Sequence, residues 1–148
     1  MRLFDAEIMA KELISKYIPD YKLEWNNHKK TYGMCSYATK TIFLSRPLTE
    51  LCDENTVRDT VMHEIAHAMH PKAGHGMDWK IQMIRFGLPP NRLCKVDIDK
   101  SSISNWEATC RTCGKVVHMI RKPRIKRSCT PCGDGKYNEK YLLTFYRI

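Results

Sequence analysis

Two histidines four residues apart, with a glutamate directly after the first, constrain this chain more than any other feature. They form the segment His63-Glu64-Ile65-Ala66-His67. On a helix such a pair lies on one face, about 6 Å apart along the axis, so both imidazoles can reach one metal ion. The next residue is offset by about 100°, which places the Glu64 carboxylate beside the metal, where it can take a proton from water. The segment therefore predicts a helix that carries a catalytic zinc site.

A catalytic zinc ion needs a third protein ligand, because three ligands leave the fourth position for water. His70 shares the helix face but lies about 10 Å from His63 along the axis, too far to reach the same ion easily. His75 is favoured, because Pro71 ends the helix and a glycine on either side of His75 frees the backbone to turn. Asp78 is a weaker alternative. The predicted metal ligands are His63, His67 and His75, and the predicted catalytic residue is Glu64.

In the expected reaction zinc polarises the scissile carbonyl, while Glu64 deprotonates the attacking water and passes the proton to the leaving amine. Tyr32 or His70 could stabilise the oxyanion, but the sequence places neither there. The competing interpretation is a structural or vacant site on a helix with ordinary histidines.

The apolar pattern around this segment predicts an α+β fold. Helical spacing indicates helices over 2–17, from an N-cap at Asp53 or Asn55 to His70, and over 77–86. Weak alternation between residues 21 and 44 indicates two or three antiparallel strands. We expect Trp79 to pack its helix onto the sheet or the first helix. The expected core residues of the last two helices are Val57, Val61, Ile65, Ala68 or Met69, Met77, Ile81 and Ile84.

Two cysteine pairs near the C-terminus predict a second zinc site. The pairs are Cys110-Arg111-Thr112-Cys113 and Cys129-Thr130-Pro131-Cys132, with 15 residues between them. This is the spacing of a structural zinc ribbon, and a redox C-x-x-C motif would need a βαβ context that is lacking here. So short a segment cannot bury enough apolar surface to fold alone, so zinc should supply most of its stability. We therefore expect two zinc ions, one catalytic and one structural.

The boundary between the two parts lies in residues 88–104, which lose clear periodicity and look like a connector. We predict a zincin-like metalloprotease domain over residues 1–100, with helices packed on a small antiparallel sheet. A basic four-cysteine zinc ribbon over residues 101–148 follows it.

The positive charge of the chain is concentrated in the ribbon. Of a formal net charge of +9, residues 108–148 carry +8, from ten Lys and Arg against Asp134 and Glu139. Such a patch attracts nucleic acid, single-stranded or branched DNA included, more than an acidic membrane surface, although it could serve solubility alone. The predicted nucleic-acid-binding residues are Arg111, Lys115, Arg121, Lys122, Arg124, Lys126 and Arg127.

The seven cysteines indicate a reducing compartment, because an odd number with only four in close pairs does not fit a secreted disulfide framework. No signal peptide and no membrane span is expected from the sequence. We therefore expect an intracellular monomer, in the cytoplasm, nucleoid or nucleus, with no membrane partner.

Taken together, these motifs resemble the SprT-like, Spartan-related family of zinc metalloproteases. The resemblance extends over Thr41-Ile42-Phe43-Leu44-Ser45, the His63–His67 helix, Gly74-His75-Gly76-Met77-Asp78-Trp79 and the four-cysteine ribbon. It implies zinc binding by His63, His67 and His75, Glu64 as acid/base, and proteolysis of proteins bound or crosslinked to DNA. Because the chain stops at Ile148 without long tails, it resembles the compact, minimal members. Two other functions stay open: a non-catalytic ribbon that binds nucleic acid, and a metalloprotease that acts on free protein.

Overall fold

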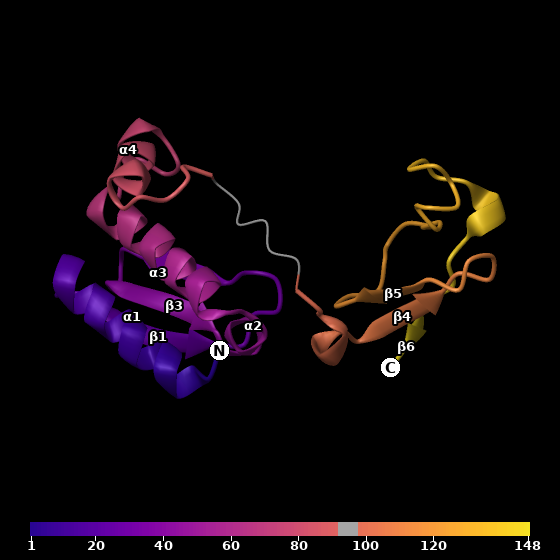
Figure 1. Cartoon of the computed structure of the whole chain (residues 1–148), viewed down its shortest axis with the longest axis horizontal. Helices are drawn as coiled ribbons and strands as arrows, with labels where there is room; N and C mark the ends of the chain where they lie inside the picture. Colours follow the sequence, from indigo (N-terminus) through magenta and orange to yellow (C-terminus); the bar gives the residue numbers. More distant parts are fainter. Residues whose placement is uncertain (92–97) are drawn as a thin grey trace. The chain divides into compact units, whose positions relative to one another are not determined.

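The structure, a computed structural model, describes residues 1–91 and 98–148 (Figure 1). The chain divides into two compact units, residues 1–98 and 99–148. The middle of the predicted connector, residues 92–97, lies outside the described residues. Within the described part, no helix is both long and apolar enough to cross a membrane.

The first unit contains a three-stranded sheet in the order β1-β3-β2, with β1 at Lys22–Asn26, β2 at Gly33–Ser36 and β3 at Thr41–Ser45. Strand β3 is central and largely buried, as its position between two neighbours requires. It pairs antiparallel with β2 but parallel with β1. The predicted α+β class is confirmed, and β2 pairs with β3 in the predicted antiparallel direction, whereas the parallel pairing of β1 with β3 was not predicted. Alternating polarity is the same for both strand directions, so the sequence pattern could not reveal this.

Among the described residues of this unit, four helices accompany the sheet: α1 at Leu3–Tyr17, α2 at Arg46–Leu51, α3 at Glu54–Met69 and α4 at Met77–Arg85. The short helix α2 was not expected from the sequence. Its local signal is the N-cap Ser45, whose hydroxyl accepts a hydrogen bond from the Leu48 backbone N–H at 3.2 Å. This helix turns the chain directly from β3 toward the start of α3.

Helix α3 supplies the centre of the core. Val57, Val61 and Ile65 recur at the expected helical spacing and are all buried, which confirms this part of the predicted stripe. At its last position Ala68 is partly buried against the core, whereas Met69 is exposed. They belong to one apolar cluster with Ile42 of β3 and Ala10 of α1. One face of α3 therefore packs against the sheet and α1, and this packing fixes the rotation of the helix about its axis.

Helix α4 buries a different face from the one predicted. Met77 and Ile84 are 70% and 60% exposed, and Ile81 is also exposed. The buried residues are Trp79, Gln82 and Met83. Both sets have helical spacing, so periodicity alone does not choose between them. Burying a tryptophan removes more apolar surface from water than burying an aliphatic side chain, which favours the face that carries Trp79.

The second unit is a small antiparallel sheet in the order β5-β4-β6. Its strands are β4 at Trp106–Thr109, β5 at Val116–Met119 and β6 at Tyr146–Arg147, and short 3₁₀ turns lie at Ser101–Ile103 and Glu139–Tyr141. The buried cluster of this unit consists of Ala108, Cys110, Cys129 and Leu143. So small a core implies another source of stability.

The buried face of α3 and the exposed face of α4 should differ in how much an isoleucine contributes to stability. Replacing Ile65, which is fully buried, by Ala should lower the free energy of unfolding by about 2–5 kcal/mol, because it leaves a cavity in the core. The same change at Ile84 should cost less than about 0.5 kcal/mol, because that side chain is mostly in water. Urea denaturation followed by circular dichroism measures both. Equal losses would contradict the assignment of the buried faces.

Candidate metal centres

The local structure around α3 brings three histidines to one place. The predicted N-cap at Asp53 is confirmed, since its carboxylate accepts a hydrogen bond from the Thr56 N–H at 2.7 Å. The helix ends at Met69, just before Pro71. In the loop that follows, Gly74 adopts a left-handed φ of 55°, which a side-chain-bearing residue rarely adopts. This turn carries the chain back, so that His75 faces α3.

The three imidazoles direct the same nitrogen toward a common point. The Nε2 atom of His67 lies 3.2 Å from that of His63 and 3.0 Å from that of His75, and the third separation is 3.2 Å. Three nitrogens at these separations have a point about 2.0–2.1 Å from each, which is the Zn–N bond length. The donor set therefore fits a zinc ion.

The protonation of the histidines also favours a cation. Burial, with smaller contributions from His67 and His75, lowers the pKa of His63 to about 4. Burial and then His75 lower the pKa of His67 to about 4. Near pH 7 these rings are neutral, and each neutral imidazole has one nitrogen lone pair. A bound dication would satisfy the lone pairs that converge here.

Glu64 lies beneath strand β2 rather than in open solvent. It is buried, and burial raises the pKa of its carboxyl group to about 7. A cation beside it would favour the ionised form. A Cβ atom added at Gly33 of β2 would lie 3.1 Å from the Glu64 Cγ and 2.9 Å from the Thr60 Cγ2. The absence of a side chain at Gly33 therefore lets β2 approach the glutamate closely.

Other residues considered from the sequence lie elsewhere. The Nε2 atom of His70 is 3.1 Å from the amide oxygen of Gln82 on α4, and His70 is outside the three-histidine group. Asp78 is exposed in the first turn of α4 and is also outside that group. The structure thus brings His75, and neither of these residues, to His63 and His67.

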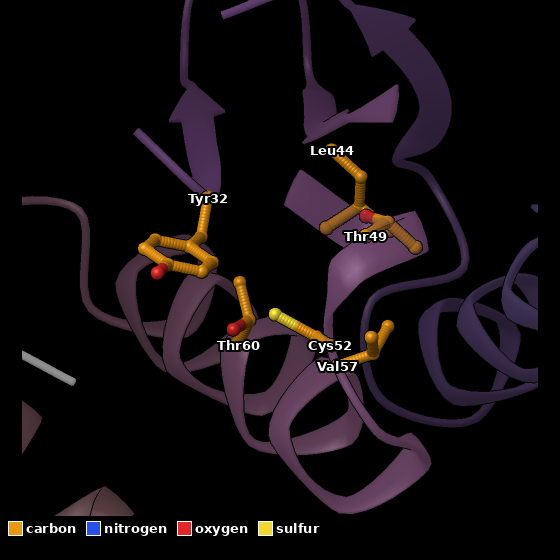
Figure 2. A pocket seen from close by; sticks show the side chains of 6 residues that line it. All are labelled: Tyr32, Leu44, Thr49, Cys52, Val57 and Thr60. Carbon is orange, nitrogen blue, oxygen red and sulfur yellow. The ribbon is translucent and has the colours of Figure 1, made fainter. Parts of the chain in front are cut away.

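Tyr32, the other oxyanion candidate, borders a small cavity of about 10 Å³ (Figure 2). A space of this size holds about one water molecule and cannot admit a substrate. None of its lining residues is a histidine of the site. They are Tyr32, Leu44, Thr49, Cys52, Val57 and Thr60.

The residue that sequence reasoning missed is Trp79. Its indole is fully buried and contacts the rings of all three histidines. The sequence signal that could have indicated this contact was its position near the start of α4, four residues after His75. Pattern analysis assigned it only to general packing.

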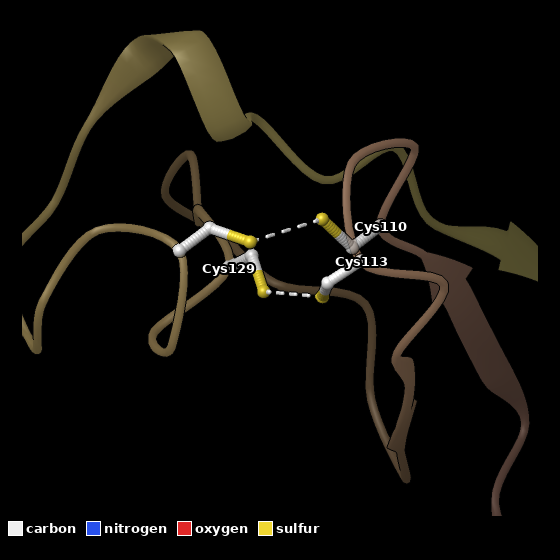
Figure 3. A group of neighbouring side chains, drawn as sticks. Cys110, Cys113 and Cys129 are labelled. Carbon is white, nitrogen blue, oxygen red and sulfur yellow. Dashed lines mark hydrogen bonds between the residues drawn. The ribbon is translucent and has the colours of Figure 1, made fainter.

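The four cysteines of the second unit, Cys110, Cys113, Cys129 and Cys132, form another cluster. Figure 3 labels the first three of them. The sulfurs of Cys110 and Cys132 are 3.9 Å apart, and those of Cys113 and Cys129 are 3.6 Å apart. Backbone N–H groups of Cys113 and Thr112 lower the pKa of Cys110 to about 6, whereas the contact with Cys113 and burial raise the pKa of Cys132 to about 12. Four thiolates this close would repel one another without a cation, so the donor set suits zinc.

The seven basic residues predicted to bind nucleic acid are all exposed. Lys122 places its ammonium 5.4 Å from the centre of the Trp106 ring, and Lys126 lies 3.6 Å from the Glu139 carboxylate. Among the nearby aromatic residues, Tyr137 and Tyr146 are exposed, whereas Tyr141 and Phe145 pack against the ribbon core. The structure thus leaves the charges accessible but only some of the rings.

Comparison with known proteins identifies relatives of the first unit. Residues 4–98 match the SprT-like family. The solved structure of the metallopeptidase zymogen jannalysin of Methanocaldococcus jannaschii is similar, with 20% identity and a TM-score of 0.49 over 55% of this chain and 81% of that one. The solved structure of the metallopeptidase zymogen abylysin of Pyrococcus abyssi is also similar, with 16% identity and a TM-score of 0.43 over 60% of this chain and 98% of that one. No curated protein sequence matches this chain.

The contact between β2 and α3 yields a prediction. Gly33→Ala should lower the free energy of unfolding by about 1–3 kcal/mol, because the new methyl group overlaps the stiff Thr60 side chain. Thr60→Ser removes the overlapped methyl group, so the double variant should recover about half of that loss. Urea unfolding of the two single variants and the double variant measures the coupling. Strictly additive losses would contradict the predicted contact.

Proposed function

Because the chain belongs to the SprT-like family, we propose that it is a zinc-dependent endopeptidase that cleaves proteins bound or crosslinked to DNA. Family membership and the three-histidine group together support a metalloprotease. The observation that carries the proposal is the convergence of three Nε2 atoms, separated by 3.0–3.2 Å. The residue directly after His63 in the sequence is a buried glutamate, Glu64.

In the proposed reaction His63, His67 and His75 would hold zinc. A zinc ion bound there would act as a Lewis acid that activates water and polarises the scissile carbonyl. Glu64 accepts a proton from the attacking water on its carboxylate and then donates it to the nitrogen of the leaving amine. Its burial against β2 orients the carboxylate and limits competing contacts with bulk water. His70 is occupied by Gln82, so we assign it no part in the chemistry.

Strand β2 offers a way to bind an extended peptide. It lies at one end of the strand order β1-β3-β2, so the backbone groups of its outer side are available for pairing. A peptide that added to this edge would run past Gly33, which lies against Glu64. Recognition through the backbone would accept many sequences, as an enzyme that removes diverse proteins from DNA requires.

The DNA-binding part of the proposal rests on the second unit. The seven exposed cations give it a strongly positive surface, and phosphate contacts dominate affinity for nucleic acid. A groove of about 250 Å³ on this unit includes Arg111 and the exposed Tyr146 in its lining. A guanidinium beside an accessible ring suits a phosphate and an unstacked base. These features support single-stranded or branched DNA as the partner.

The chemistry is tested by Glu64→Gln, which removes the base but keeps a side chain of similar shape. We expect this variant to retain its zinc and to lose at least about 100-fold of the cleavage rate on a DNA-crosslinked protein, the scale of a lost acid/base group. Gel electrophoresis of the substrate measures cleavage, and elemental analysis measures zinc, expected at two ions per chain.

The control is Glu50→Gln, which makes the same chemical change at an exposed position of α2. Undiminished cleavage by Glu64→Gln would refute the assigned role. Cleavage of free protein at the same rate, with or without DNA, would indicate a protease that does not depend on DNA. If the wild type binds DNA but cleaves no member of a panel of DNA-bound proteins, the protein would be a non-catalytic one that binds nucleic acid through its ribbon.

The DNA-binding surface is tested by replacing Arg121, Lys122 and Arg124 together with Gln. Binding to a fluorescein-labelled single-stranded oligonucleotide, followed by anisotropy, should weaken by about tenfold or more and should depend less steeply on salt, because fewer counterions are released. The matched control removes three exposed charges from the first unit, at Lys11, Lys16 and Lys22. Equal weakening by both triple variants, or binding insensitive to salt, would contradict the assignment.

A further inference from the structure

The indole of Trp79 touches every ring of the three-histidine group. Its centre lies 4.8 Å from the ring centres of His63 and His75 and 5.6 Å from that of His67. It meets His63 and His75 edge to face, at 65° and 85°, and stacks on His67 at 26°. One side chain thus forms a common platform for three imidazoles that come from two different segments.

This platform is itself held in place. Trp79 is fully buried and belongs to an apolar cluster with Ala66 of α3 and Met83 of α4. Its Nε1–H donates a hydrogen bond to the backbone carbonyl of His63 at 3.4 Å. The indole is therefore anchored to both helices, and one of its anchors is the backbone of a histidine that it supports.

We propose that Trp79 is a positioning residue, which holds His63, His67 and His75 in the geometry that binds the metal. The last side-chain torsion of a histidine is broad, so an unsupported imidazole can rotate its Nε2 away from the site. Contacts on the rings restrict that rotation before the metal arrives. Binding then loses less side-chain entropy, and the affinity rises.

The contrasting explanation is that Trp79 only fills the core between α3 and α4. The two explanations differ in what a substitution without a ring does to zinc affinity at the histidines. Met83 provides the matched control, because it lies in the same buried cluster but one turn further along α4. The ribbon cysteines provide an internal control, because a second metal site is in the same chain.

The experiment compares the full-length wild type with Trp79→Met, Trp79→Phe and Met83→Ala. Each protein is freed of metal and titrated with Zn²⁺ in competition with a chromophoric chelator. Titration with Co²⁺ identifies the ribbon site by its thiolate charge-transfer absorption, which histidine ligation does not produce. Trp79→Met should weaken zinc binding at the histidines by about 10–100-fold, the effect of losing a residue that orients metal ligands, whereas Trp79→Phe and Met83→Ala should stay within about threefold.

Wild-type affinity in Trp79→Met would overturn the proposal, as would equal losses in Trp79→Met and Met83→Ala or in Trp79→Met and Trp79→Phe. If Trp79→Met does not fold, a variant that retains only this tryptophan, Trp25→Phe/Trp106→Phe, decides. Co²⁺ should then quench its emission with the midpoint of the histidine site. If the emission of Trp79 does not change when Co²⁺ fills the histidine site, the contacts between the indole and the histidine rings would be refuted, and the proposal with them.

The inference rests on the proposed zinc binding at the histidines and not on proteolysis. A wild-type protein that binds zinc only at the ribbon would refute the histidine site itself, before any variant is compared. A wild type that binds two zinc ions but cleaves no protein would leave the role of Trp79 fully testable, because its measure is metal affinity.

Discussion

The packing of α4 against the C-terminal half of α3 is the interaction on which the candidate active site depends. Two of the three converging histidines come from α3, and the third comes from the loop that leads into α4. Trp79 of α4 is buried against Ala66 of α3, and its ring contacts those of all three histidines. The apolar contact between the two helices and the three-histidine group therefore share one buried indole.

The position of Glu64 depends on the other side of α3, which packs against the sheet and α1. Helix α3 turns Val61 and Ile65 toward the sheet and α1, which fixes its rotation, and Glu64 then comes to lie under β2. The strand can come so close only because residue 33 is glycine. Burial raises the pKa of Glu64 to about 7, so this carboxyl group can take up and release a proton near neutral pH. Packing thus sets the chemistry of this carboxyl group as well as its position.

The second unit follows a different physical plan. Its apolar cluster is small, and two of the four buried members are cysteines whose sulfurs face the other pair. It buries few apolar side chains, and its charged residues are mostly basic, with eleven Lys and Arg against four Asp and Glu over residues 99–148. The first unit is nearly neutral and holds the histidines. The division proposed between chemistry in one unit and DNA binding in the other follows from this contrast.

The sequence by itself determined what depends on local geometry: a helix that begins at Asp53 or Asn55, most of its buried stripe, and the side-by-side placement of His63 and His67. Helical periodicity and capping depend on residues a few positions apart, so both can be recognised in the sequence. Only the tertiary structure decided the direction of β1 against β3, the buried face of α4, and the meeting of Trp79 and Gly33 with the site. Each of these depends on which distant surface a segment meets, and several arrangements satisfy the same local pattern until burial selects one.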